Sequence, residues 1–391
     1  MANELKKMIR RIGKQHGKLE TELNRLWWTI ANNTRSPESQ RAAEIELSLK
    51  NLYRDGALFA SIEAQLALGD EAPDRMLLRQ HEAIARNFMR EQNPDELRNK
   101  IISIAAVLEK KFSEFRPTVV HDGVRRKVSL STIVNTLKCE QDQVKRRACW
   151  EAGQKVGRHL HRAKFLRLVE LRNEAARRAG FSNFHALSLA MGSLQEDFVA
   201  QLFDDLDAAT APHYFAMKTE LDARLAGHWG VGVGEIMPWH YEDLFFQEVP
   251  QCVTLSLDDL ITMNPVGPVS KLFRGLGLSL DDIFYNSDLF ERRYKNPHAF
   301  CIYINRKGDV RILANVRRSF NWTVTLLHEA GHAAYFKHIS KRLPYLLREP
   351  AHTFTTEGVA MMMQRLAYSP SWMEKAMGME PGQVEQLSPL L

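Results

Sequence analysis

The stretch His328-Glu329-Ala330-Gly331-His332 decides both the fold and the chemistry of this chain, and Glu357 follows it downstream. Residues four apart lie on one face of an α-helix, so His328 and His332 can offer two imidazole groups to one metal ion. Glu329 then stands beside that ion, placed to take a proton from a zinc-bound water whose pKa the metal lowers to about 7. The HExxH pattern therefore suggests metal-assisted hydrolysis.

The residues around this pentapeptide predict that it lies inside a helix. The preceding segment Phe320–Leu327 suits a helix, Ser319 or Asn321 can cap it, and the next proline is Pro344. Gly331 costs about 1 kcal/mol relative to alanine in a helix interior. We therefore expect another group to approach the backbone closely at this glycine.

A catalytic zinc site with one open position needs a third protein ligand, for which Glu357 is the candidate. Glu357 begins a second helical stretch, Thr353–Tyr368, and the intervening Lys341–Pro344 makes a turn, so two neighbouring helices can bring it to the imidazole pair. Alternatively, Glu357 favours a helix N-terminus through the macrodipole, and the two histidines are satisfied core residues. The residues expected to form the buried face of the second helix are Val359, Met362, Met363 and Leu366.

The segment from Leu326 to Tyr368, LLHEAGHAAYFKHISKRLPYLLREPAHTFTTEGVAMMMQRLAY, resembles the zinc-binding core of the gluzincin metallopeptidases. The resemblance is to the angiotensin-converting-enzyme (peptidyl-dipeptidase) family and its oligoendopeptidase and thimet-oligopeptidase relatives, and it covers most of the chain. It implies that His328, His332 and Glu357 bind one Zn²⁺ per chain and that Glu329 is the general base. Supporting segments upstream are LVELRNEAARRAGFSNFHAL (168–187), PWHYEDLFFQ (238–247) and NPHAFCIYINRKGDVRILAN (296–315).

The chain departs from this family pattern in two ways. In those families, tyrosine and histidine side chains that bind the tetrahedral intermediate come from a helical region beyond the third ligand, but this sequence stops at Leu391. Either the C-terminal region is missing, or zinc and a local donor stabilise the oxyanion. A carboxylate that orients a zinc-bound histidine is replaced by Met361, so a backbone carbonyl or another acid is expected to hold that ring. The local donors considered are Tyr335, Tyr345, His352 and His298.

A β-hairpin is predicted just before the zinc helix. Residues Ala299–Ile304 and Val310–Asn315 flank the turn Arg306–Asp309. An exposed edge of this hairpin can pair with an extended peptide and align it over the metal, and the resemblance implies the same use. Without the resemblance, an ordinary hairpin that binds no ligand is the better interpretation. The candidate substrate-binding residues are His298, Ala299, Tyr335 and His352.

The chain is long enough to bury a large core, since it has 391 residues, of which 45% are hydrophobic. The spacing of apolar residues in its longest stretches predicts a mostly α-helical protein. We expect one helical, gluzincin-like peptidase domain over residues 1–391, divided into an N-terminal helical lobe (1–229) and a zinc-binding catalytic lobe (251–391). A flexible connection, Gly227–Pro250, joins them, and Arg116–Leu130 is a second connection. The expected amphipathic helices are Glu4–Asn32, Glu38–Leu68, Asp74–Met89, Pro94–Phe115, Asp142–Ala179 and Gln195–Ala226.

The charge and apolar patterns argue against nucleic-acid and membrane partners. The formal net charge is +6, but acidic residues share the same helices as the basic clusters, so these helices are expected to be solvated. The basic balance favours short peptides with acidic groups as substrates. No run of apolar residues is long enough to span a bilayer, the amino terminus lacks the apolar core of a secretory signal, and we expect a cytoplasmic protein. The four cysteines, Cys139, Cys149, Cys252 and Cys301, lack paired metal-ligand spacing.

Three functions follow from these observations. The first is zinc-dependent hydrolysis of short peptides, by oligopeptidase or dipeptidyl carboxypeptidase action. The second is a peptidase-like scaffold that binds peptides without cleaving them. The third is a di-iron carboxylate protein, suggested by the pairs Glu329-x-x-His332 and Glu349-x-x-His352. The third is disfavoured because Pro350 follows Glu349 and the two pairs are too close for two bundle helices.

Overall fold

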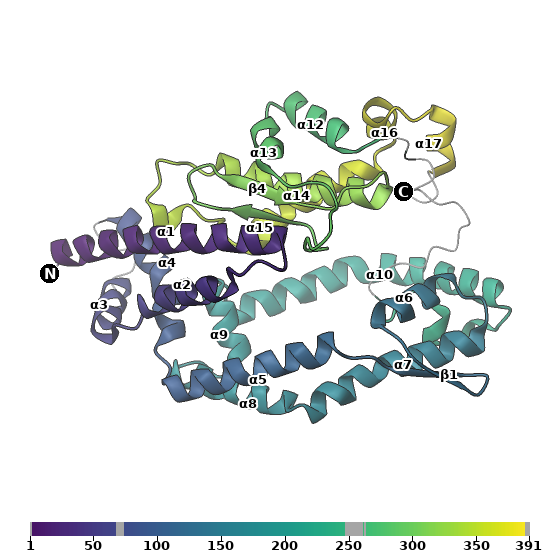
Figure 1. The fold of residues 1–391 in the computed structure, drawn as a ribbon, viewed down its shortest axis with the longest axis horizontal. Helices are drawn as coiled ribbons and strands as arrows, with labels where there is room; N and C mark the ends of the chain where they lie inside the picture. Colours follow the sequence, from purple (N-terminus) through teal and green to yellow (C-terminus); the bar gives the residue numbers. More distant parts are fainter. Residues whose placement is uncertain (1, 68–73, 247–260, 262, 388–391) are drawn as a thin grey trace. The chain divides into compact units, whose positions relative to one another are not determined.

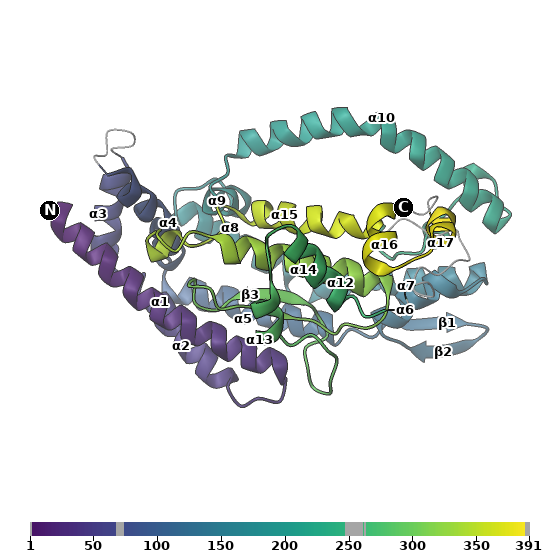
Figure 2. The same ribbon diagram turned by 90° about the horizontal axis from the view of Figure 1, so that it is seen from above.

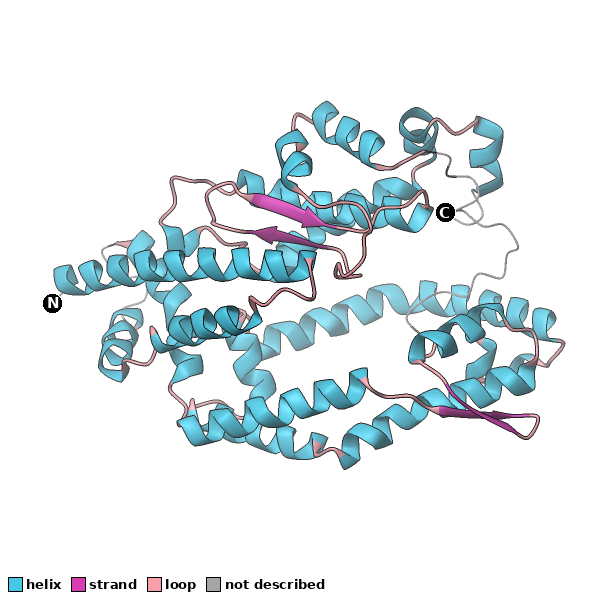
Figure 3. Ribbon diagram, viewed as in Figure 1, coloured by secondary structure: helices cyan, strands magenta, loops and turns pink. Residues whose placement is uncertain are grey.

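The computed structural model describes residues 2–67, 74–246, 261 and 263–387, and most of these residues are helical (Figure 3). The prediction of a mostly α fold with a short hairpin near the zinc helix is confirmed. The chain divides into two compact units, Met1–Gln92 with Leu255–Leu391, and Asn93–Thr254. Both ends of the chain therefore belong to the same unit, which also contains His328, His332 and Glu357.

The first part of this unit consists of four helices. They are α1 (Ala2–Asn32), α2 (Ser39–Asn51), α3 (Gly56–Leu66) and α4 (Arg75–Glu91), and α1 and α2 lie side by side in both ribbon views (Figures 1 and 2). The single helix predicted over residues 38–68 is wrong. The chain breaks at Asp55, whose side chain accepts a hydrogen bond from the Leu58 N–H and thereby caps α3. Buried residues shared by α1, α3 and α4 include Leu5, Ile9, Ile12, Leu58, Ile62, Ile84 and Phe88.

The second part of the unit surrounds a small hairpin and one central helix. Strands β3 (Phe300–Tyr303) and β4 (Val310–Leu313) are antiparallel, with Phe300 opposite Leu313. The predicted hairpin is thus confirmed, and its buried residues pack against α14 to form one core cluster. The helices and turns of this part are α12 (Val266–Gly275), α13 (Asp281–Asn286), α14 (Phe320–His338), η4 (Tyr345–Leu347), α15 (Thr353–Arg365), η5 (Leu366–Tyr368), α16 (Pro370–Met377) and α17 (Pro381–Leu387).

Of the four residues predicted to form the buried face of α15, Met363 is buried and Val359 and Leu366 are partly buried, but the prediction for Met362 is wrong. Met362 is 57% exposed, whereas Ala360 is fully buried and Thr356 nearly so. Residues two apart point about 200° away from each other on a helix, so a helix that turns Ala360 inward must turn Met362 outward. The small side chains of Thr356 and Ala360 allow α15 to lie close to α14, which the larger methionine would prevent.

The other unit is also helical, with one hairpin. The connection predicted over residues 116–130 contains strands β1 (Thr118–His121) and β2 (Val124–Lys127), whose turn places Asp122 and Gly123 at φ 51° and 73°. The helix predicted over residues 142–179 is broken near Lys164, which has φ 71°. The helices of this unit are α5 (Asp95–Ser113), α6 (Leu130–Cys139), α7 (Gln143–Arg162), α8 (Phe165–Arg178), α9 (Phe184–Met191) and α10 (Glu196–Trp229), followed by η2 (Val233–Glu235) and η3 (Pro238–His240).

Candidate metal centre

The candidate centre depends on how closely α14 and α15 approach each other. Gly331 of α14 faces the α15 backbone, because a Cβ atom at this position would lie 2.7 Å from Ala360 Cα and 3.2 Å from the Val359 carbonyl oxygen. This is the close approach that the glycine predicts, and the two helices lie side by side in both views (Figures 1 and 2). Ala360 is three residues after Glu357, so the same contact brings Glu357 to the HExxH turn.

The structure brings the three candidate ligands together. The Nε2 atoms of His328 and His332 are 3.1 Å apart. Glu357 Oε2 lies 3.5 Å from His328 Nε2, and Glu357 Oε1 lies 3.6 Å from His332 Nε2. Helix α14 begins as expected, because the Ser319 hydroxyl accepts a hydrogen bond from the Trp322 N–H. Three donor atoms of the types that bind zinc therefore converge within 4.8 Å.

Both histidine rings are held through their other nitrogen by side chains of α15. His328 Nδ1 is 2.9 Å from Gln364 Oε1, and His332 Nδ1 is 2.8 Å from Thr356 Oγ1. When each Nδ1–H donates to these oxygens, each Nε2 keeps a free lone pair for a metal. Sequence reasoning expected a backbone carbonyl or an acid and missed both residues. Gln364 lies two turns after Glu357, so helical spacing is the signal that identifies it.

Glu329 lies in a buried position next to the candidate ligands. Its exposed fraction is 8%, and burial, reinforced by the nearby Glu357 carboxylate, raises the pKa of Glu329 to about 7. A hydrogen bond from the Cys301 backbone N–H acts in the opposite direction. Burial, followed by the nearby His328 ring, lowers the pKa of His332, although Glu357 opposes this change. The low pKa favours the neutral imidazole that a metal requires.

A cavity of about 630 Å³ opens onto these residues. Strand β3 contributes Phe300, Cys301 and Tyr303 to the lining of this cavity, and Ala299 precedes them. Of the four residues predicted to bind substrate, Ala299 lines the cavity and the other three do not. His298 is exposed, Tyr335 Oη lies 3.3 Å from Thr355 Oγ1, and the His352 ring accepts a hydrogen bond from the Phe354 N–H at the start of α15.

Sequence reasoning also missed an ion cluster around the buried Arg306 at the rim of this cavity. The Arg306 guanidinium in the β3–β4 turn contacts the carboxylates of Glu20 in α1 and Glu349. Tyr345 Oη donates a further hydrogen bond of 2.5 Å to Glu20 Oε2. Burial acts to raise the pKa of Glu20, but the hydrogen bond with His16 and the charge of Arg306 outweigh it and lower the pKa to about 2. Arg306 and Glu20 lie 286 residues apart, so no local pattern predicts their contact.

The second Glu-x-x-His pair does not join the candidate centre. Glu349 follows η4 outside any helix and contacts Arg306, while His352 caps α15. Across the part of the chain that the structure describes, the only group of His, Cys, Asp and Glu side chains close enough to hold a metal ion is His328, His332 and Glu357. This arrangement agrees with the sequence argument against a di-iron site.

Comparisons with known proteins place the chain in a family. The family model described as angiotensin-converting enzyme (Peptidase M2) matches residues 1–233, which precede the HExxH motif. Comparison with curated proteins gave no match. Among the described residues, we find no helix that combines the length and apolar character of a membrane span. Because the family model matches more than half of the 391 residues, this chain belongs to the angiotensin-converting enzyme family of peptidases.

Proposed function

We propose that this protein hydrolyses peptide bonds in short peptides, with one zinc ion held by His328, His332 and Glu357. The observation that supports this most is the convergence of these donors within 4.8 Å beside a buried carboxylate, Glu329. Two imidazoles and one carboxylate are a common ligand set for zinc in hydrolases. Family membership supports a peptidase independently, since the matched residues 1–233 do not include the donors.

The donor set fits zinc for two reasons. Its atoms come from neighbouring turns of two packed helices, and Gln364 and Thr356 hold the rings with Nε2 directed at the common point. A zinc ion bound there would act as a Lewis acid on the scissile carbonyl and on water. Glu357 is partly exposed, with 45% of its side chain accessible, so the centre is open to solvent on one side.

Glu329 is the residue that we propose moves protons. Its carboxylate takes a proton from the attacking water and then delivers it to the departing amine nitrogen. The hydrogen bond from the Cys301 N–H fixes the carboxylate against β3. General acid–base catalysis of this kind contributes about 10²- to 10⁴-fold in rate.

Strand β3 is the proposed binding edge for the peptide backbone. One of its edges pairs with β4, and Phe300, Cys301 and Tyr303 line the cavity at the candidate centre. Asn24 of α1 donates to the Tyr303 and Ile304 carbonyl oxygens, so a bound peptide would pair with the earlier residues from Ala299. Pairing of an extended peptide with a free strand edge aligns its carbonyl groups in a fixed register.

The test combines metal analysis with peptide cleavage. The full-length chain should contain one zinc and should cleave quenched fluorescent peptides until a chelator removes the metal. The Glu329→Gln variant should keep its zinc yet lose about 10²- to 10⁴-fold in rate. Mass spectrometry of the products distinguishes endopeptidase action from release of C-terminal dipeptides. Bound zinc without cleavage would favour the binding-only scaffold, and two irons would favour the carboxylate protein.

The cytoplasmic location is also a proposal. It is supported by the free thiols of Cys139, Cys149 and Cys301, since reducing compartments keep thiols free. Recovery of the protein in a secreted or periplasmic fraction of its native cells would contradict it.

A further inference from the structure

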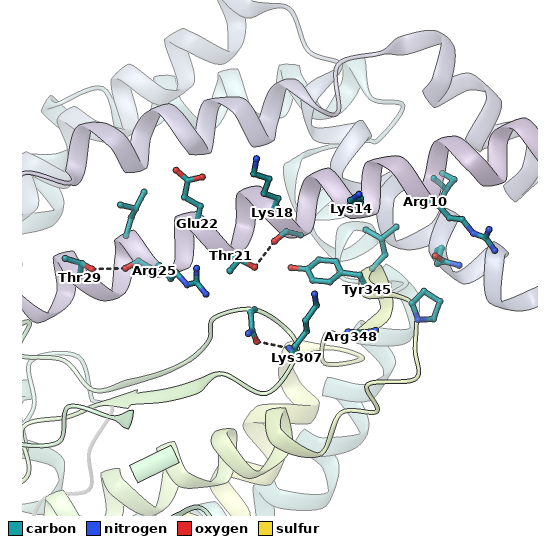
Figure 4. A pocket seen from close by; sticks show the side chains of 18 of the residues that line it. Arg10, Lys14, Lys18, Thr21, Glu22, Arg25, Thr29, Lys307, Tyr345 and Arg348 are labelled. Atoms are coloured by element: carbon teal, nitrogen blue, oxygen red, sulfur yellow. Dashed lines mark hydrogen bonds between the residues drawn. The ribbon is translucent and has the colours of Figure 1, made fainter. Parts of the chain in front are cut away.

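A second cavity, of about 1010 Å³, runs along helix α1 in the same unit as the candidate metal centre. We call it the basic groove. Its walls are one face of α1, the turn residues Asn305 and Lys307, and the segment Pro344–Leu346 with Arg348 (Figure 4). Figure 4 shows Tyr345 between α1 and the side that carries Lys307 and Arg348.

Two glycines of α1 allow Tyr345 and Leu346, on the other side of the groove, to pack closely against the helix. A Cβ atom at Gly17 would lie 2.9 Å from the Tyr345 ring, and one at Gly13 would lie 3.4 Å from Leu346 Cγ. Glycine inside a helix costs about 1 kcal/mol relative to alanine, so both positions are explained by the close contact they permit. The groove is therefore a packed feature of the fold, and a loose gap between helices would not need these glycines.

The lining of the basic groove is strongly positive. Four of its cations come from α1 at spacings that place them along one side of the helix, and two come from the opposite wall. Among the described residues, the only acids in the lining are Glu22, which pairs with Arg41 at 2.8 Å, and Glu38. The six cations are Arg10, Lys14, Lys18, Arg25, Lys307 and Arg348.

Most of these cations have no carboxylate partner within the described residues. Arg10, Lys14, Lys18, Arg25 and Lys307 are exposed, and no ion pair joins any of them to an acid in that part of the chain. The sixth, Arg348, donates from Nε to the Leu343 carbonyl oxygen at 2.8 Å, which fixes its guanidinium at the end of the groove. A concave surface with many cations of this kind focuses a positive electrostatic potential and therefore attracts anions.

The basic groove adjoins the cavity of about 630 Å³ at the candidate metal centre, which we call the metal-site cavity. Arg348 lines both cavities, and the border between them is formed by the contact of Tyr345 with Glu20. Arg306 on this border is already neutralised by Glu20 and Glu349, whereas its neighbour Lys307 faces the groove without such a partner among the described residues. A peptide that occupies the metal-site cavity could therefore reach the groove past Arg348.

We propose that the basic groove binds acidic side chains of the peptides that enter the metal-site cavity, so that the enzyme selects acidic peptides. This inference rests on the proposed peptidase function. A nucleic acid is a poorer fit, because Tyr345, the only aromatic residue in the lining, has its hydroxyl engaged by Glu20 and its ring against Gly17. Stacking platforms for bases are thus absent from the described lining.

The first test measures binding without turnover. The full-length chain with Glu329→Gln is titrated against fluorescein-labelled hexaglutamate, hexaglutamine and a six-nucleotide oligothymidylate. Hexaglutamate should bind about tenfold more tightly than hexaglutamine at low salt, and the difference should shrink at about 0.5 M salt because exposed charges are screened. Equal binding of the two peptides would overturn the proposal, and so would tighter binding of the oligothymidylate.

The second test assigns the binding to the groove. The double variant Arg25→Glu, Lys307→Glu reverses one charge on each wall, and the control Arg11→Glu, Arg342→Glu makes the same change in net charge at exposed cations that line neither cavity. The groove variant should weaken hexaglutamate binding about tenfold and the control less than about twofold. Equal losses in the two variants would show that only net charge matters and would overturn the assignment. Circular dichroism of each variant establishes that it is folded.

Peptide cleavage by the chain with Glu329 intact separates this inference from the proposed function. If acidic peptides bind in the groove and none is cleaved, the peptidase proposal fails and the groove proposal stands as a binding site. If acidic and neutral peptides are cleaved with equal KM, and the groove variant leaves both unchanged, the peptidase proposal stands and the groove proposal fails. The expected result is a higher KM for acidic peptides alone in the groove variant.

Discussion

His328 and Gln364 are joined by a hydrogen bond of 2.9 Å between Nδ1 and Oε1, which connects the HExxH helix to α15. The partner of a ligating histidine fixes the ring and its tautomer, and losing it commonly lowers metal affinity about 10- to 100-fold. We expect this loss in Gln364→Ala, measured by competition for zinc with a chromophoric chelator. Gln364→Glu keeps an acceptor oxygen at the same place and should retain most of the affinity. An alanine variant with unchanged zinc affinity would remove Gln364 from the centre.

The close approach of α14 and α15 gives a prediction about stability and metal binding together. In Gly331→Ala, the new methyl group would meet Ala360 Cα at 2.7 Å, so the helices must separate. We expect a loss of about 1–3 kcal/mol in the free energy of unfolding and weaker zinc binding, because Glu357 moves with α15. Gly358→Ala is the matched control, since nothing lies within 4 Å of a Cβ there and alanine favours the helix by about 1 kcal/mol. Similar results for both variants would contradict this account.

The buried Glu20 carboxylate predicts a dependence of stability on pH. Its pKa is about 2 in the folded protein and 4.5 without the fold, so the stabilisation is complete above pH 4.5 and is lost as the pH falls towards 2. The shift corresponds to about 3 kcal/mol at neutral pH. Urea unfolding should show Glu20→Gln less stable than the wild type at pH 7, with the gap closing as the pH falls below 4.5.

Glu44→Gln serves as the control for this pH dependence. Glu44 pairs with Arg41 on the surface, where 54% of its side chain is exposed. Such a pair contributes less than about 1 kcal/mol. A gap between wild type and Glu20→Gln that stayed constant from pH 7 to pH 2 would show that Glu20 acts through packing and not through its charge.

The contact between Gly17 and Tyr345 predicts that α1 tolerates no side chain there. In Gly17→Ala, the methyl group would lie 2.9 to 3.1 Å from three ring atoms of Tyr345. The ring must shift, which weakens its hydrogen bond to Glu20, and we expect a loss of about 1–2 kcal/mol in unfolding free energy. Gly157→Ala in α7, where a Cβ atom meets nothing within 4 Å, should instead be neutral or stabilising. Thermal unfolding of both variants measures this difference in stability. Equal stabilities would show that the Tyr345 ring can move without destabilising the fold.

What the sequence predicts well is local. The helix around His328, its Ser319 cap, the β3–β4 hairpin and the close contact at Gly331 all follow from residues near one another in the chain. The helix breaks at Asp55 and Lys164 were missed because the helical spacing of apolar residues continues across both positions. The helical conformation of the backbone is nevertheless interrupted there. Lys164 adopts a positive φ without being glycine, so its residue type gives little warning.

What the sequence does not predict is contact between distant residues. Glu20 and Arg306, which pair at the rim of the candidate centre, lie 286 residues apart, and neither local sequence pattern indicates the other residue. The basic groove has the same origin, since its walls come from α1 and from residues after 300. Composition indicated an excess of positive charge but not where that charge gathers.

The pairing of Glu20 with Arg306 also bears on how the protein is made. A ribosome releases α1 long before it synthesises the β3–β4 turn. After Glu20, 286 further residues must be added before Arg306 is in the chain. Meanwhile the residues 93–254 can complete their own unit. The walls of the candidate centre can thus close only after the β3–β4 turn, α14 and α15 have been synthesised, so a shorter nascent chain carries α1 without the centre that it helps to enclose.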